Sequence, residues 1–301
     1  MAERVVVRYR LPSGQLTDVI GMLEADDPLL VRRADGTAVH IERDAVVALK
    51  AVPPMTIRTR DIRALEYAAA DGWPGVQREW IDGWLLRAGH GFTSRANCAV
   101  PLAESATIDV FDAVRSWFDA RGLPVKVLVP DRIGIVPPGW RTVDEVIVLA
   151  ADIDTLTLPP GRAMVIVDPE PAPAWLGLFR HRGSSAPRGA AEVLASVQDG
   201  VVGFGRLGVV GPSGMPLAIA RAAVTTAPDN RRWVGLTAVE VAPEHRRRGL
   251  GTLICASMIG WGRDHGATHA YLQVSAGNEA ALAMYAELGL VEHHRYRYAM
   301  P

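Results

Sequence analysis

The stretch VAPEHRRRGLGTLICA, residues 241–256, constrains the fold of this chain more than any other. A β-rich segment, WVGLTAVEV, precedes it, and apolar side chains follow its glycines at helical spacing. That spacing predicts a helix that begins at the glycines and buries one face. The positions expected on this face are Leu250, Leu253, Ile254, Met258 and Trp261. The segment therefore predicts a strand, a tight basic turn and a helix in direct succession.

The first turn of such a helix leaves backbone N–H groups unpaired and carries the positive end of the helix dipole. Gly249 and Gly251 remove the side chains that would keep an anion away from these groups, and Arg246, Arg247 and Arg248 add positive charge. The combination predicts a site for a phosphate group, in particular a pyrophosphate. A basic run alone would instead indicate a solvated surface.

Two other sequence patterns are typical of nucleotide-binding sites. The sequence has no G-x-x-x-x-G-K-[ST], which excludes a nucleoside-triphosphate P-loop. A G-x-G-x-x-G pattern occurs at Gly203, Gly205 and Gly208, but it lies between two β-rich runs and opens no helix. It therefore indicates a glycine-rich strand or hairpin.

Composition narrows the class of protein. The 301 residues are 49% hydrophobic, and 32 Lys+Arg against 33 Asp+Glu give a net charge of −1. Near-neutrality argues against a dedicated nucleic-acid or membrane-surface protein. Two distant cysteines, Cys98 and Cys255, indicate no disulfide framework, and no metal-ligand spacing occurs. With no apolar run of signal-peptide or membrane-span length, a cytoplasmic protein without a metal is expected.

The periodicity divides the chain into three parts of an α/β (α+β) protein. Residues 1–54 contain short β-rich runs and predict a compact SH3-like β-barrel, with VPP at 52–54 as a linker. Residues 56–158 alternate helical and strand patterns, with helices expected at 60–72 and 106–122 and strands at 83–89, 94–102 and 124–130. Residues 159–301 form the third part.

A weak internal repeat links the second and third parts. Trp117 and Gly122 align with Trp261 and Gly266 at an offset of 144, each pair belonging to a helix that ends in Gly and feeds an apolar strand. Any helix–Gly–strand unit would match about as well, so duplication and coincidence both stay open. The first copy has no counterpart of RRRGLG.

Arg246-x-x-Gly249-x-Gly251 resembles the acyl-CoA pyrophosphate signature of the GNAT superfamily of N-acetyltransferases. The segment QVSAGNEAALAMYAELGL also resembles that superfamily, through Asn278, Tyr285 and Gly289. The resemblance covers about 200–301, and residues 56–158 resemble a degenerate GNAT half. The whole arrangement is similar to a mycobacterial GNAT protein described as a histone acetyltransferase.

The resemblance implies an acetyl-CoA-dependent N-acetyltransferase and a role for each matching residue. The backbone of Val239 and Val241 would pair with the pantetheine arm, Asn278 would bind the arm, and Tyr285 would protonate the departing thiolate. The pyrophosphate would lie against Arg246, Arg247, Arg248, Gly249, Leu250, Gly251 and Thr252. Tyr285 can also be read as a core aromatic, and Asn278 as a helix N-cap.

The general base and the acceptor stay open. Glu240 is the nearest acidic side chain, but strand alternation places it on the face opposite Val239 and Val241. His269, His293 and His294 are weaker candidates. The acceptor amine is expected to be a protein lysine, as in a histone-like basic protein, or a small metabolite. The alternative from another class is a regulatory protein that binds acyl-CoA without turnover.

Overall fold

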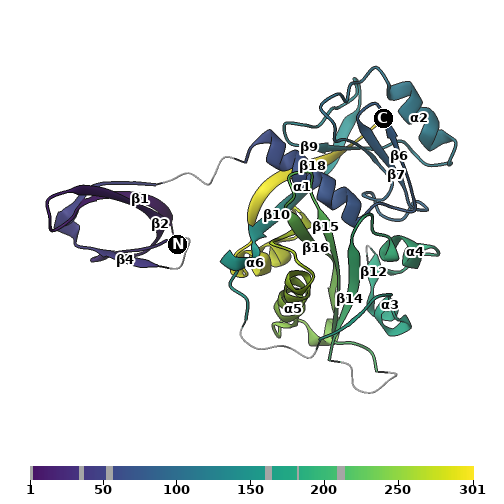
Figure 1. Cartoon of the computed structure of the whole chain (residues 1–301). Coiled ribbons are helices and arrows are strands. Elements are labelled where there is room, and N and C mark those ends of the chain that lie inside the picture. Colours follow the sequence, from purple (N-terminus) through teal and green to yellow (C-terminus); the bar gives the residue numbers. More distant parts are fainter. Residues whose placement is uncertain (1–2, 34–36, 52–56, 160–164, 182, 209–213) are drawn as a thin grey trace. The chain divides into compact units, whose positions relative to one another are not determined.

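The computed structural model describes residues 3–33, 37–51, 57–159, 165–181, 183–208 and 214–301 (Figure 1). The chain divides into two compact units, Met1–Ile57 and Arg58–Pro301, which are described separately. The linker predicted at 52–54 lies outside the described residues. The further boundary predicted at residues 158 and 159 falls inside the second unit and stays a prediction.

The first unit is an antiparallel sheet of five strands in the order β4-β3-β2-β1-β5. The strands are β1 (Glu3–Arg10), β2 (Leu16–Asp26), β3 (Leu29–Arg32), β4 (Ala38–Ile41) and β5 (Val46–Ala51), with a short 3-10 turn at Arg43–Ala45. Alternating side chains bury a small core of Val5, Val7, Val19, Leu29, Val31 and Ile41. In the described residues no ladder joins the edge strands β4 and β5, so closure into an SH3-like barrel stays a prediction.

The second unit is built on one sheet of 11 strands in the order β11-β14-β15-β16-β17-β10-β18-β9-β8-β7-β6. Its first half contains α1 (Thr59–Gly72), β6 (Gln77–Ile81), β7 (Trp84–Ala88), β8 (Ala99–Pro101), α2 (Phe111–Asp119), β9 (Val127–Pro130), β10 (Arg141–Asp152) and a 3-10 turn at Ile153–Thr155. The remaining elements are β11 (Val165–Asp168), α3 (Pro173–Leu178), β12 (Arg180–His181), β13 (Ser184–Ser185), α4 (Ala190–Ala195), β14 (Val201–Leu207), β15 (Ala218–Thr226), β16 (Arg232–Val241), a 3-10 turn at Pro243–His245, α5 (Leu250–Asp264), β17 (His269–Ser275), α6 (Glu279–Glu287) and β18 (Val291–Met300).

The sheet has the same strand pattern on each side of its centre. From β14 to β17 and from β6 to β9 the order and pairing directions match, with the only parallel ladders of the described residues at β16–β17 and β8–β9. The last strand of each half crosses over, because β10 pairs with β17 and β18 pairs with β9. Gly122 and Gly266, aligned in the sequence, both have positive φ, 62° and 83°. The two halves therefore share one continuous sheet.

Two elements of the first half begin five residues later than predicted. The helix expected from residue 106 begins at Phe111, because Trp84 Nε1 donates to the carbonyl of Thr107 at 2.8 Å and this segment forms turns. The strand expected over 94–102 covers Ala99–Pro101, because the side chain of Asn97 takes up backbone groups of the preceding loop.

Helices cover both faces of the second half of the sheet. Val234 packs with Ile254 and Met258 of α5, whereas the neighbouring Trp233 packs with Leu65 of α1. Adjacent residues of a strand point to opposite faces, so α5 and α1 lie on opposite sides of β16. The predicted apolar face of α5 is buried or partly buried throughout.

Candidate active site

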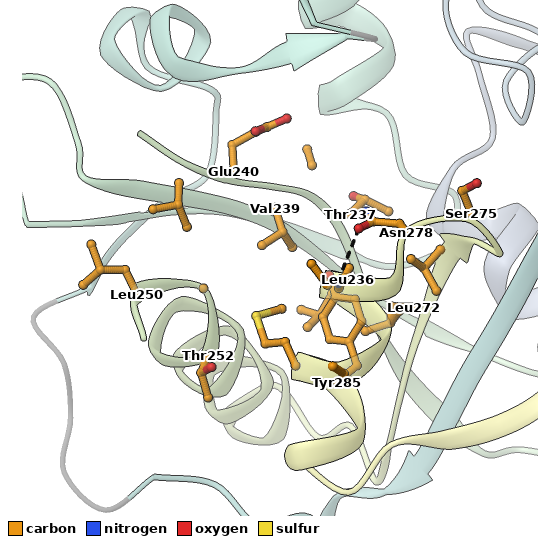
Figure 2. Close-up of a pocket in the computed structure, with 18 of the residues that line it drawn as sticks. Leu236, Thr237, Val239, Glu240, Leu250, Thr252, Leu272, Ser275, Asn278 and Tyr285 are labelled. Carbon is orange, nitrogen blue, oxygen red and sulfur yellow. Dashed lines mark hydrogen bonds between the residues drawn. The ribbon is translucent and has the colours of Figure 1, made fainter. Parts of the chain in front are cut away.

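A cavity of about 850 Å³ lies beside the carboxyl ends of β16 and β17 (Figure 2). Four segments of the C-terminal half line it, and one residue of the first half joins them. The lining consists of residues 236–241 of β16, 246, 247 and 249–252 of the basic turn and α5, 272–275 of β17, 278, 280, 281, 283–285 and 287 at α6, and Arg95.

The cavity exists because β16 and β17 separate. Their parallel ladder ends at the pair Leu236 and Leu272, although β16 continues to Val241 and β17 to Ser275. A bulge lies directly after the last pair, where Ala238 has φ 52° and the register with β15 shifts. The edge of β16 beyond Leu236 therefore has no β17 partner.

The basic turn presents a row of backbone N–H groups. Arg247 and Gly249 have positive φ, 61° and 74°, and α5 begins at Leu250. The first helical hydrogen bond runs from Leu253 N to Gly249 O at 3.0 Å. No described residue accepts a hydrogen bond from the N–H groups of residues 247–252. Together with the helix dipole, these groups form the geometry that binds phosphate.

Charge and space at the turn agree with this chemistry. The three arginines are exposed, and Arg246 Nε donates to Val241 O at 3.3 Å; Arg248 is adjacent to the cavity lining without forming part of it. A Cβ on Gly251 would lie 2.8 Å from Met284 Sδ, so the absence of a side chain lets α6 approach α5. No atom lies within 4 Å of a Cβ built on Gly249. Glycine is favoured at this position because its φ is positive.

The matching turn of the first half lacks these features. Between β8 and α2 the chain reads AESATIDV, and α2 begins after Val110 with Asp112 in its first turn. Acidic side chains replace the arginines, and no glycine lies at the helix start. This turn does not fit a phosphate group.

Asn278 and Tyr285 lie at opposite ends of α6 and both line the cavity. Asn278 caps α6, since its Oδ1 accepts from Ala281 N at 3.2 Å. Tyr285 is 7% exposed, and no hydrogen bond joins its hydroxyl to another described residue. Burial, with a smaller contribution from Cys255, raises the pKa of Tyr285, so its phenol stays protonated at neutral pH.

Glu240 lines the cavity on the other side of β16. In Figure 2 its side chain extends away from Tyr285, whereas Val239 extends toward Tyr285, as the strand alternation predicts. Burial raises the pKa of Glu240, while the guanidinium groups of Arg246 and Arg180 act in the opposite direction. A carboxylate with a raised pKa is a better proton acceptor near neutral pH than an ordinary one.

The three histidines considered as bases do not line this cavity. His269 packs against Trp233 at the other end of β17, with ring centroids 4.7 Å apart. His294 Nε2 lies 2.8 Å from Glu66 Oε1, and both side chains are almost fully buried. His293 contacts His294 through their Nδ1 atoms, 2.8 Å apart. In the described part of the chain, no three His, Cys, Asp or Glu residues are grouped to hold a metal ion.

Arg95 is a charged lining residue from the first half that the sequence analysis missed. It lies in the loop between β7 and β8, and its Nη1 donates to Gln273 Oε1 of β17. The two residues are 178 positions apart, so no local pattern links them. The available signal was the polar loop GHGFTSRAN, which interrupts two apolar strands.

Two family models match the chain, one for each of its two compact units. The family described as "Probable histone acetyltransferase Rv0428c C-terminal" matches residues 59–299, and "Rv0428c N-terminal Sm-like domain" matches residues 1–50. The chain belongs to this family of GNAT-type N-acetyltransferases. The domain predicted as SH3-like is thus described in its family as Sm-like.

Two curated relatives and one solved structure show how far the similarity extends. "Probable histone acetyltransferase Rv0428c" of Mycobacterium tuberculosis is 40% identical over 304 residues, covering 99% of this chain and 94% of that protein. "Uncharacterized N-acetyltransferase YobR" of Bacillus subtilis is 26% identical over 262 residues, covering 79% and 98%. A GCN5-related N-acetyltransferase from Kribbella flavida has the same fold, with a TM-score of 0.53, 18% identity and coverage of 79% and 94%.

No helix of the described residues is long and apolar enough to cross a membrane.

Proposed function

We propose that this protein transfers the acetyl group of acetyl-CoA to a primary amine, with a protein lysine as the first candidate acceptor. The observation that carries the proposal is the row of unpaired N–H groups at residues 247–252, which borders the cavity that Tyr285 lines. The name of the mycobacterial relative favours a histone-like basic protein as acceptor. The buried free thiols of Cys98 and Cys255 favour the cytoplasm as compartment.

The cavity supplies separate places for the parts of acetyl-CoA. The pyrophosphate would bind the N–H groups of residues 247–252 and the arginines of the turn. The pantetheine arm would pair with the free edge of β16 at Val239 and Val241, as an added strand does, and Asn278 would bind it from α6. The volume of about 850 Å³ lies in the range of ligand sites.

The proposed reaction needs a hydrogen-bond donor for the leaving sulfur and an acceptor for the proton of the amine. The two candidates lie on opposite sides of β16. A neutral amine attacks the thioester carbon, a C–N bond forms and the C–S bond breaks. The proton that the nitrogen loses passes to the departing thiolate, so CoA leaves as a thiol. The Tyr285 hydroxyl would donate to the leaving sulfur. A phenol is a weaker acid than a thiol, whose ordinary pKa is about 8.5, and burial raises the pKa of Tyr285 further. This hydroxyl therefore stabilises the leaving sulfur by donating a hydrogen bond.

Glu240 is the proposed acceptor of the proton that an ammonium loses before attack. Its raised pKa and its place in the lining support this role, and its orientation away from Tyr285 separates the proton acceptor from the donor. An N–H of the bulged β16 would stabilise the oxyanion.

The test offers the full-length protein acetyl-CoA with two acceptor pools, a lysine-rich basic protein such as a histone and a panel of small amines. CoA release and product mass are followed. Acetylation of lysine in the protein pool is the expected result and makes the N-terminal domain a candidate docking module. Acetylation of small amines alone would overturn the lysine proposal and keep the transferase. Acetyl-CoA binding without any product would favour a non-catalytic acyl-CoA-binding protein.

A further inference from the structure

We propose that the acceptor amine also carries a carboxylate, and that Arg95 of the first half binds this carboxylate. The inference rests on the proposed transferase function and adds a substrate class to it. Among the described residues, Arg95 in the loop of residues 89–97 is the one outside the C-terminal half that lines the cavity.

This loop is held in one conformation by the side chain of Asn97. Its Oδ1 accepts from Gly89 N at 2.8 Å and Gly91 N at 3.0 Å, and its Nδ2 donates to the carbonyls of Phe92 and Thr93 at 2.8 Å each. Asn97 is 7% exposed. A buried amide that satisfies four backbone groups fixes the loop rather than leaving it free.

Two residues of the loop adopt a costly backbone conformation. His90 and Thr93 have φ of 54° and 61°, although neither is glycine. Trp73 Nε1 donates to Thr93 Oγ1 at 3.0 Å, which ties the loop to the end of α1. Residues held in such conformations cluster at functional sites, because the surrounding structure must be built to hold them.

Neighbouring residues hold the Arg95 side chain in position, but no described carboxylate neutralises its charge. Its Nη1 donates to Gln273, and its guanidinium carbon lies 5.4 Å from the centroid of the Trp73 ring. Among the described residues, no Asp or Glu forms an ion pair with it. Since a guanidinium has five N–H donors, Arg95 keeps donors for a ligand.

A second guanidinium without a carboxylate partner lies near the same Trp73 ring as Arg95. Arg221 is fully buried and lies 4.7 Å from the same Trp73 ring. It donates to the carbonyls of Gly72, Leu194 and Ser196, and no described carboxylate pairs with it. Burial lowers its pKa to about 9, so Arg221 remains charged at neutral pH. Two cations without a counter-ion create a positive potential at this end of the cavity.

The acidic residues of the lining do not cancel this potential. Glu240 and Glu287 are the only carboxylates among the described lining residues, and neither pairs with Arg95. The arginines that lower the pKa of Glu240 are Arg246 and Arg180. An acceptor that brings a carboxylate to Arg95 along with its amine fits this distribution of charge.

The carboxylate can come from a free amino acid or from an acidic residue beside a lysine. The test titrates two matched pairs into the full-length protein with CoA bound. One pair is L-lysine and 1,5-diaminopentane, which differ by the carboxylate. The other is a lysine peptide with a flanking Glu and the same peptide with Gln. Calorimetry gives the affinities for the wild type, Arg95→Gln, Arg95→Lys and the control Arg115→Gln, an exposed arginine of α2.

We expect the wild type to bind the carboxylate-bearing member of one pair about 10- to 100-fold more tightly, as for loss of a charge-assisted hydrogen bond. Arg95→Gln removes this preference, Arg95→Lys keeps part of it, and Arg115→Gln keeps all of it. Which pair responds identifies the source of the carboxylate. Equal affinities within both pairs, or no binding by any member, would overturn the inference.

Acetyl-CoA affinity separates this inference from the proposed function. It is measured first on the wild type, where absence of binding would refute the transferase itself. A loss of acetyl-CoA affinity in Arg95→Gln with unchanged acceptor preference would show that Arg95 holds the cofactor, and would also overturn the inference. Thermal unfolding of the variants identifies any that fail to fold.

Discussion

Leu236 and Leu272 form the last pair of the parallel ladder between β16 and β17, and the cavity opens directly beyond them. The bulge at Ala238 carries β16 away from its neighbour. The split leaves an unpaired edge of β16 in the cavity lining, with Tyr285 on one side of the strand and Glu240 on the other. The position at which two strands stop pairing thus determines where the proposed reaction takes place.

Tyr285→Phe tests the proposed donor to the leaving sulfur. Removing the hydroxyl while keeping the ring should lower kcat by about 100-fold and leave acetyl-CoA affinity nearly unchanged, because the ring keeps its packing. Steady-state kinetics and calorimetry give the two values. The control is Tyr67→Phe, a residue of α1 that stacks on Trp80 outside the cavity. An unchanged kcat in Tyr285→Phe would reduce that residue to a packing role.

Glu240→Gln separates stability from activity. Burial raises the pKa of Glu240, so the folded state disfavours its charged form. The free energy of unfolding therefore decreases as the pH rises above the ordinary pKa of a glutamate. The amide should therefore raise Tm at pH 8 more than at pH 4, while kcat falls. Thermal unfolding at both pH values and activity assays measure this. A lower Tm at pH 8 with full activity would contradict both roles.

His293 makes the fold sensitive to acid. Burial, and then the neighbouring His294 and Arg231, lower its pKa from 6.5 to about 3. The unfolded chain takes up a proton near pH 6.5 that the folded chain does not, so stability is present above this pH and is lost as the pH falls toward 3. The loss from this group is about 2 kcal/mol at pH 5.

His293→Asn should therefore reduce the decrease in unfolding free energy between pH 7 and pH 5. Denaturant titration at the two pH values measures that difference. His265→Asn, at the exposed end of α5, serves as the control and should keep the wild-type decrease. The same pH dependence in His293→Asn and the wild type would show that another group carries the acid sensitivity.

The parts of the site that the sequence could predict are local ones. The turn and helix at residues 246–264 follow from neighbouring residues, because glycine geometry, charge and helical spacing all act within a few positions. Asn278 and Tyr285 follow from the adjacent segment, and the structure brings them to the same cavity as the turn. The bulge at Ala238 has no comparable local signal, since alanine rarely adopts a positive φ.

The parts that the sequence could not predict depend on distant segments. The crossing of β10 and β18 pairs Ile147 with Arg295, and no periodicity encodes such a pairing. Arg95 reaches the cavity only because the two halves share one sheet. The strand predicted from residue 94 begins at Ala99. The Asn97 side-chain amide forms hydrogen bonds with backbone groups of the loop, which takes the place of strand pairing there.

Calorimetric titration of acetyl-CoA into the wild type, Gly251→Glu and two controls shows whether the turn before α5 holds the pyrophosphate of acetyl-CoA. Gly260→Glu controls for the added charge, because Gly260 lies in the same helix and no atom lies within 4 Å of a Cβ placed there. Gly251→Ala controls for the contact of a Cβ at position 251 with Met284 Sδ. We expect the wild type and Gly260→Glu to bind acetyl-CoA equally, and Gly251→Glu to bind it more than about 100-fold more weakly than Gly251→Ala, because the added carboxylate repels the phosphate. Equal affinity in Gly251→Glu and Gly251→Ala would contradict a pyrophosphate site at this turn.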